Sequence, residues 1–399
     1  MRARGAIIAA SGAAFLACGC SLLGDGAAMA PPTHGEITPA EDTPWATDVW
    51  QPGSAVDASW PLALSEDGDV LIRYSDDPSS WEDGVDDGET GLAIVSPNGD
   101  IEYLEAPGEG TLADDVLFAK LNESTIALVN DSESADNPDT AMWLVDRDTG
   151  VVTPIPSVVP DGALEGERVL PGPDFTLIDD TVLWAFLGVF AADSNGRVWN
   201  PWGASPNVFS FKRNDCEGES VVSAVSRSWS EEAPITEVTY TEATLDDHGM
   251  LQVDPDSVFI LDQERDGAAP LHGVTRCGDS ILGAAWGSMG DEGAEYLMAT
   301  VETATLEPTG ISAEGVPIAS FLTEKWIAVA ASGPLLRSRT SIVNRSTGEQ
   351  WNPGGDSMCG GLLEVSGRTI MWAEPAEDWS DEFPPMGQCI TYVGTLRTD

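Results

Sequence analysis

The sequence predicts an all-β protein, a β-propeller with seven four-stranded blades, and six blades as the alternative. Three observations predict this fold. Apolar runs of four to seven residues alternate with turns rich in Gly, Asp, Asn and Ser, and no 3.6-residue period is sustained. A polar turn followed by an apolar strand recurs seven times, and strand–turn–strand motifs with a glycine fall between its members. Regular short strands are typical of sandwiches, barrels and propellers.

The spacing of the first motif favours a propeller. Its first strand residues are Val70, Ile126, Val182, Val221, Ile281, Trp326 and Ile370. Successive members are 56, 56, 39, 60, 45 and 44 residues apart. The mean of about 50 is the length of a four-stranded blade. Six blades result if residues 177–225 form a single expanded unit.

The second motif predicts a hairpin in the outer half of a blade. It occurs at residues 93–104, 143–155, 189–199 and 341–351, and in a degenerate form at 298–310. Asn-Gly and Thr-Gly in these turns tolerate the positive φ that a tight hairpin needs. Each blade is therefore expected to contain two hairpins, formed by strands A–B and C–D.

These repeats resemble those of bacterial β-propeller proteins in general. The stretch "NRSTGEQW" (344–351) is also similar to the Asp-box of sialidase-like propellers, although Ser346 replaces the key Asp. In the related stretch at 146–153, Thr153 stands where the Trp would be. Asp-boxes are structural turns remote from the active site, so the resemblance implies a propeller and not sialidase activity.

The N-terminus predicts export. Arg2 and Arg4 precede an apolar segment, Gly5–Ala17, that is too short to span a bilayer and is typical of a signal peptide. The segment ends in cysteine, which resembles the lipobox of bacterial lipoproteins. That resemblance implies lipidation of Cys20, with Cys18 as the alternative, and an anchor on the outer face of the bacterial cell membrane.

The expected organisation is a lipoprotein-type signal peptide at 1–19, a flexible tether at 20–44 and a propeller domain at 45–399. The tether is rich in Ala, Gly, Pro and Thr and has no periodicity. After residue 30 no stretch has 18 consecutive apolar residues, so the lipid is the only expected membrane contact.

The charge of the chain limits its partners. It has 67 acidic and 18 basic residues, a formal net charge of -49. Such a surface repels nucleic acid, and we expect no nucleic-acid partner. It favours solubility, with attraction of cations or of a basic partner as the alternative. We expect a monomer whose ligand is a protein, a peptide or a glycan.

The remaining cysteines predict two disulfides, because an even number in an exported chain is typically paired. The four are Cys216, Cys277, Cys359 and Cys389, and three pairings are open. Cys216 and Cys277 occupy equivalent places in neighbouring repeats, which favours a bridge between blades. Cys359 and Cys389 flank the last blade and could staple it where the ring closes.

The predicted binding face is the one that carries the B–C loops. These loops are long and acidic, and long loops on a rigid scaffold commonly carry binding function. Their tryptophans could stack on a sugar ring or contact a cation. The candidate residues are Trp81, Glu82, Asp83, Trp229, Trp379 and Asp381.

No catalytic signature accompanies these loops. The sequence has no H-E-x-x-H, P-loop or nucleophile elbow, and we expect no cofactor and no metal. The acidic segment 75–91 offers oxygen ligands for Ca²⁺, but its spacing matches no defined loop. The alternative to a binding module is a glycan-active hydrolase or lyase with carboxylates near the propeller channel. Three or more buried carboxylates meeting an Arg or Tyr there would favour the enzyme.

Overall fold

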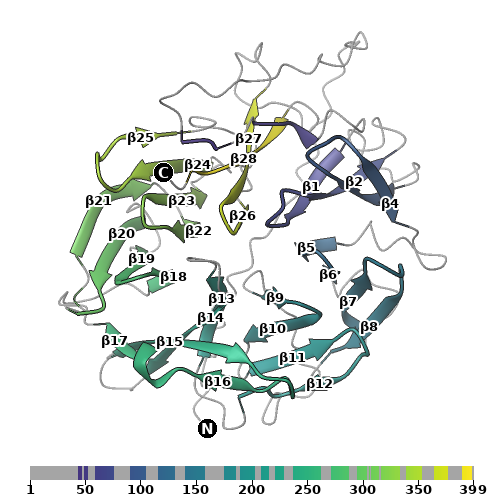
Figure 1. Ribbon diagram of the computed structural model, residues 1–399, viewed down its shortest axis with the longest axis horizontal. Coiled ribbons are helices and arrows are strands. Elements are labelled where there is room, and N and C mark those ends of the chain that lie inside the picture. Colours follow the sequence, from purple (N-terminus) through teal and green to yellow (C-terminus); the bar gives the residue numbers. More distant parts are fainter. Residues whose placement is uncertain are drawn as a thin grey trace, which may run out of the picture.

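The computed structural model is a ring of seven β-sheets, with the first strand of each sheet toward the centre (Figure 1). No helix in the ranges that follow is long and apolar enough to cross a membrane. The structure describes residues 44–46, 49–52, 59–75, 90–104, 116–130, 140–157, 175–185, 189–202, 208–214, 221–228, 237–261, 271–286, 294–302, 305, 307–313, 316–332, 338–352, 364–375 and 389–397.

Each blade is an antiparallel meander whose strands follow the chain from the centre outward. Blade 1 contains β1 (Ser59–Leu64), β2 (Val70–Ser75), β3 (Thr90–Val95) and β4 (Ile101–Leu104). Blade 2 contains β5 (Val116–Leu121), β6 (Thr125–Asn130), β7 (Thr140–Asp146) and β8 (Val152–Pro156). Blade 3 contains β9 (Thr176–Ile178), β10 (Thr181–Ala185), β11 (Val189–Asp193) and β12 (Val198–Trp199).

The other blades follow the same plan. Blade 4 contains β13 (Val208–Asn214), β14 (Val221–Ser228), β15 (Glu237–Leu245), β16 (Leu251–Val253) and β17 (Phe259–Leu261). Blade 5 contains β18 (Leu271–Cys277), β19 (Ser280–Trp286), β20 (Ala294–Thr300) and β21 (Glu307–Ala313). Blade 6 contains β22 (Val316–Leu322), β23 (Trp326–Ser332), β24 (Ser338–Asn344) and β25 (Gln350–Trp351). Blade 7 contains β26 (Glu364–Ser366), β27 (Thr369–Pro375) and β28 (Cys389–Thr395).

Seven blades are thus confirmed. The six-blade alternative is wrong, because residues 177–225 belong to two sheets: β9–β12 form one, and β13 begins the next.

Both sequence motifs correctly predicted the positions of strands. Every polar turn of the first motif is followed by strand B of a blade, which starts at the predicted residue or one residue earlier. The second motif forms the C–D hairpins of five blades, and its turn glycines take positive φ, such as 86° at Gly99 and 68° at Gly150. The C–D hairpin β15–β16 of blade 4 was missed, although Gly249 in its turn has a φ of 74°.

The N-terminal segment closes the ring. The outer edge of β28 pairs with residues near the start of the described chain, through antiparallel bridges Trp45↔Leu396 and Trp50↔Val393. The Trp45 ring stacks on that of Trp372 at a centroid distance of 4.7 Å. Gly394 permits this contact, because a Cβ there would lie 2.8 Å from the Trp45 ring. The fourth strand position of blade 7 is therefore occupied from the other end of the chain.

The apolar core lies between the blades. One buried cluster joins Val129 and Leu144 of blade 2 to Leu177 and Trp184 of blade 3, and others join the remaining neighbours in the same way. Four of the strand tryptophans that the sequence predicted as packing residues contact such clusters, which confirms that role: Trp143, Trp184, Trp326 and Trp372. The ring thus gains much of its stability from burying apolar surface between adjacent sheets.

Candidate functional site

The predicted binding residues lie outside the described residues. This applies to Trp81, Glu82, Asp83, Trp229, Trp379 and Asp381, to the segment 76–89 that holds most of the acidic stretch, and to Cys18 and Cys20. The structure does place the ends of the strands from which these B–C connections leave. Residues 76–89, 229–236 and 376–388 connect β2 to β3, β14 to β15 and β27 to β28. In every meander the B–C connection and the A–B and C–D turns lie at opposite ends of the strands. The B–C connections therefore leave one face of the ring, and the short turns form the other.

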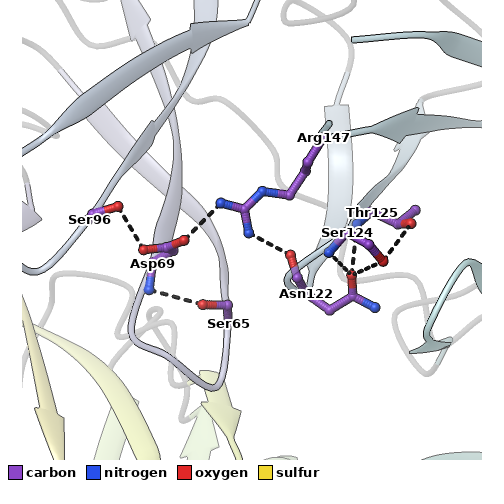
Figure 2. Close-up of polar contacts among 7 residues, drawn as sticks. All are labelled: Ser65, Asp69, Ser96, Asn122, Ser124, Thr125 and Arg147. Carbon is purple, nitrogen blue, oxygen red and sulfur yellow. Dashed lines mark hydrogen bonds and ion pairs between the residues drawn. The ribbon is translucent and has the colours of Figure 1, made fainter. Parts of the chain in front are cut away.

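On the turn face, an arginine ties blade 1 to blade 2. Arg147 follows strand β7 and donates through Nη2 to Asp69 Oδ2 at 2.8 Å and through Nη1 to the carbonyl of Asn122 at 2.6 Å (Figure 2). Asp69 also accepts from Ser96 Oγ at 2.8 Å. The side-chain amide of Asn122 donates to the carbonyl of Asp179 in blade 3 at 2.7 Å. One polar network therefore spans three blades.

Blade 6 repeats this arrangement. Arg345 follows β24 and donates through Nη1 to the carbonyl of Thr323 at 2.7 Å and through Nη2 to Ser280 Oγ of blade 5. The two arginines occupy the same place in the stretches "DRDTG" (146–150) and "NRSTG" (344–348). Each guanidinium bridges the A–B turn of its own blade and that of the preceding blade, which suits its planar fork of donors.

The residue before each arginine shapes the turn. Asp146 Oδ1 accepts from the backbone and the hydroxyl of Thr149 at 2.8 and 2.7 Å, and Asn344 Oδ1 accepts from Ser346 in the same way. The hydroxyl hydrogen bond from Thr149, more than any other contact, holds the pKa of the exposed Asp146 carboxyl below its ordinary value. These Asp-box-like stretches are C–D turns, as the resemblance implied, and their polar groups are used within the fold.

A second polar group lies near the centre of the ring. Glu364 of β26 is buried and accepts from Lys120 Nζ of β5 at 2.7 Å, and its other oxygen accepts from the backbone N–H of Leu64 in β1 at 2.9 Å. Lys120, whose side chain is 34% exposed, still reaches solvent. Three consecutive blades, 7, 1 and 2, therefore meet at one carboxylate.

The strand registers explain how this pair forms. Lys120 pairs with Ala127, Glu364 with Met371 and Ala63 with Leu71, and each partner is the residue after the first core position of its strand B. The three A-strand residues are therefore equivalent in blades 2, 7 and 1. Blade 1 carries alanine at this position, and its contact with the pair comes from the backbone N–H of the next residue, Leu64.

The burial of Glu364 has an electrostatic consequence. Desolvation raises the pKa of this carboxyl, while the Lys120 ammonium and the hydrogen bonds from Lys120 and Leu64 act in the opposite direction and do not cancel it. A buried ion pair of this kind contributes little net stability, but removing one partner leaves a buried group without compensation.

A third polar cluster links blades 4 and 5. Glu242 of β15 is buried and accepts from the hydroxyl of Tyr240 and from Arg276 Nη1 of β18, each at 2.8 Å. The Arg276 guanidinium also lies 5.1 Å from the centre of the Phe259 ring. Glu242 lies on a third strand, whereas Glu364 lies on a first strand and in another pair of blades.

These clusters bear on the enzyme hypothesis. Among the residues whose side chains are described, Glu242 and Glu364 are the buried carboxylates, and they belong to separate clusters. The described residues therefore do not bring together three buried carboxylates. Each of the two acids is paired with a basic side chain of another blade, so both contribute to the contacts between blades.

Sequence reasoning missed these polar clusters. The repeated "R-x-T-G" in 147–150 and 345–348 was a usable signal for the arginines. A signal for Lys120 was its rarity, because the chain has only three lysines. Glu364 had no comparable signal, because it is one of 67 acidic residues.

Two of the predicted disulfide cysteines lie in described strands. Cys277 is buried at the end of β18, and its disulfide stays a prediction. Cys216 and Cys359 lie outside the described residues, and Cys389 is the first residue of β28. The two pairings remain predictions.

Solved structures match the chain at low similarity, whereas no family model and no curated protein sequence matches it. TolB from Acinetobacter baumannii has a TM-score of 0.36 and 14% identity, covering 66% of this chain and 59% of that one. A puromycin-hydrolyzing peptidase from Mycobacterium tuberculosis has a TM-score of 0.39 and 15% identity, covering 79% and 57%. The β-propeller domain of the Trilobed protease from Pyrococcus furiosus has a TM-score of 0.44 and 9% identity, covering 79% and 91%.

The chain therefore spans less than two thirds of the length of TolB and of the peptidase. At these identities and TM-scores the relatives' activities do not transfer to this chain. The arrangement of its own strands makes it a seven-bladed β-propeller.

Proposed function

We propose that the protein is an exported, lipid-anchored β-propeller that binds a protein, peptide or glycan through its B–C connections. One observation carries the proposal: the two arginines of the turn face and their partners are engaged in bonds within and between blades. Arg147, Asp69 and Asn122 satisfy one another there, and Arg345 is used in the same way. The opposite face carries the long acidic segments with Trp81, Trp229 and Trp379.

The position of the N-terminal segment is compatible with an anchor. The predicted tether ends at residue 44, and the Pro44 carbonyl accepts from the backbone N–H of Arg397 at 2.9 Å. A lipid on Cys20 would therefore be joined by residues 21–43 to the outer edge of blade 7. The intact mass of the protein extracted from membranes tests this: a diacylglyceryl adduct on a chain that starts at Cys20 or Cys18 supports the anchor, and an unmodified chain contradicts it.

The enzyme alternative has one group in its favour, the buried Glu364 with its raised pKa, which is a property of general acids. However, both of its oxygens accept hydrogen bonds from other blades. These hydrogen bonds between blades are sufficient to explain why the carboxylate is buried. We therefore propose binding, with a monomeric propeller, in preference to glycan hydrolysis or lyase chemistry.

A glycan and peptide array tests the proposal. The full chain is compared with the triple variant Trp81→Ala/Trp229→Ala/Trp379→Ala and with Tyr103→Ala, which removes an aromatic side chain that is 57% exposed on β4. We expect ligands that the wild type and Tyr103→Ala retain and the triple variant loses. Ligands that the triple variant retains with unchanged affinity would contradict the proposed face. Cleavage of an arrayed glycan that Glu364→Gln abolishes would favour the enzyme.

A further inference from the structure

The outer edge of blade 4 differs from the outer edges of the other blades. Its outermost strand is divided into β16 and β17, which both pair with β15, and a short 3₁₀ turn, η3 (Pro255–Ser257), lies between them. Three of the five large hydrophobic residues that are exposed among the described residues lie here: Val253, Val258 and Ile260, with exposed fractions of 37%, 44% and 56%.

The division of this strand is built into the fold. Asp254 accepts from the N–H of Asp256 at 3.0 Å, and Pro255 cannot continue the strand ladder. Ser257 is fully buried, and its hydroxyl accepts from the N–H of Glu242 at 2.9 Å and donates to the carbonyl of Asp254 at 2.8 Å. The protruding turn is therefore held in place by hydrogen bonds and presents its apolar neighbours on a rigid base.

All three apolar side chains point to the side of blade 4 that faces blade 3. Successive side chains of a strand alternate between its two faces. Phe259 packs beside Tyr240 and under Arg276, on the side of blade 5, so Val258 and Ile260 point the other way. Leu251 packs against blade 3, and Val253, two residues later, shares its face.

Blade 3 leaves this side uncovered because its outer strand is short. β12 has two residues, and the Trp199 indole N–H in it donates to the carbonyl of Gly249 at 2.7 Å. This contact lies at the C–D turn of blade 4. β12 therefore covers the start of β16, at Leu251. Val253, Val258 and Ile260, which follow Leu251 in the chain, stay exposed.

We propose that Val253, Asp254, Asp256, Val258 and Ile260, here called the blade-4 shelf, bind an extended segment of a partner protein that alternates apolar and basic side chains. Buried apolar surface provides the affinity, and the exposed Asp254 and Asp256 select basic side chains. Among the described strands, β17 pairs only with β15, so an added strand could lie along its outer side. The shelf is separate from the B–C connections and does not depend on the proposed binding face.

Charge selects this occupant over two others. A second copy would bring its own Asp254 and Asp256 and a net charge of -49, so like charges would oppose a symmetric contact. An anionic bilayer is disfavoured for the same reason. A basic segment is attracted by the same negative charges, so they favour its binding.

The test uses the full chain and two labelled eight-residue peptides, one alternating valine with lysine and the other alternating serine with lysine. Fluorescence anisotropy measures binding at physiological salt. The valine–lysine peptide should bind more tightly, and Val258→Thr/Ile260→Thr should weaken its binding about fivefold or more. Val151→Thr is the matched control, because Val151 is 57% exposed on another blade, and its effect should stay below about twofold. Asp254→Asn/Asp256→Asn should weaken both peptides and reduce the salt dependence.

Equal binding of the two peptides, or equal effects of the shelf and control variants, would overturn the proposal. Binding would then be explained by the overall negative charge of the chain and not by the shelf. Sedimentation velocity of the wild type and the shelf variant tests whether a second copy of the chain binds the shelf. Flotation with phosphatidylcholine vesicles tests whether a bilayer does. Dimerisation or vesicle binding that the shelf variant loses would also overturn the choice of partner. Thermal unfolding confirms that the variants are folded, which is expected for substitutions at exposed positions.

Discussion

Lys120 and Glu364 occupy equivalent positions on the first strands of blades 2 and 7, and their charged groups meet 2.7 Å apart. The pair connects residues that are 244 positions apart in the chain. With the bond from Leu64, it ties together the three blades that adjoin the point of ring closure.

Glu364→Gln should change how stability depends on pH. Because burial raises the pKa of Glu364, the folded protein binds a proton there more tightly than the unfolded chain. This contribution is fully present below the ordinary pKa of the carboxyl and is lost as pH rises through the raised value. The free energy of unfolding of the wild type should therefore fall relative to that of Glu364→Gln as pH rises from the ordinary carboxyl pKa through the raised one.

Urea denaturation across this range checks the prediction, with the exposed Glu102→Gln as the control. A wild type that instead gains stability over Glu364→Gln as pH rises would show that Lys120 outweighs desolvation.

Arg147→Ala and Arg345→Ala should each destabilise the ring by about 1–3 kcal/mol, because each leaves acceptors in two A–B turns without their donor. The two sites lie in blades 2 and 6 and share no partner, so the double variant should be additive within about 0.5 kcal/mol. Lysine should rescue neither, since one ammonium does not reproduce the two-pronged contact of a guanidinium. Chemical denaturation measures the two alanine variants, the double variant and the two lysine variants, and full rescue by lysine would argue against the bridging role.

Gly394→Ala should loosen ring closure. A Cβ there meets the Trp45 ring at 2.8 Å, and we expect a cost of about 1–3 kcal/mol. In a Trp45→Ala background the same substitution should cost much less, because the ring it would strike is gone. A double-mutant cycle measures this coupling, and strictly additive effects would mean that the Trp45–Gly394 contact does not limit closure.

Gly249→Ala should cost more than Gly150→Ala. Both glycines have positive φ, 74° and 68°, so alanine strains the backbone at either site by about 1 kcal/mol or more. At Gly249 a Cβ would also lie 2.6 Å from the Trp199 ring, whereas at Gly150 nothing lies within 4 Å. The difference in unfolding free energy reports the contact between blades 3 and 4, and equal costs would contradict that contact.

The blade pattern could be predicted from the sequence because it depends on local features. The period-2 strands and the glycine turns lie within a few residues of one another, and they located strand B in every blade. The hairpin β15–β16 was missed because its turn, Asp246–Gly249, has neither Asn-Gly nor Thr-Gly. No local sequence pattern in residues 45–50 predicts the pairing that closes the ring. The partners of Trp45 and Trp50, which are Leu396 and Val393, lie at the other end of the chain.

The candidate sites were less predictable for the same reason. Arg147 was visible within a repeated turn motif, but its partner Asp69 lies 78 residues away. The blade-4 shelf depends on how much of blade 4 the two-residue strand β12 covers, which is a property of two neighbouring blades. Such relations follow from tertiary packing and not from the pattern of either segment.

Hydrogen–deuterium exchange of the full chain with an array-selected ligand tests most directly which face of the ring binds. We predict that the ligand slows exchange in the B–C connections at 76–89, 229–236 and 376–388 and leaves the turns at 65–69, 122–125 and 345–349 unchanged. Slower exchange confined to the turn face, with no change in the B–C connections, would contradict the account.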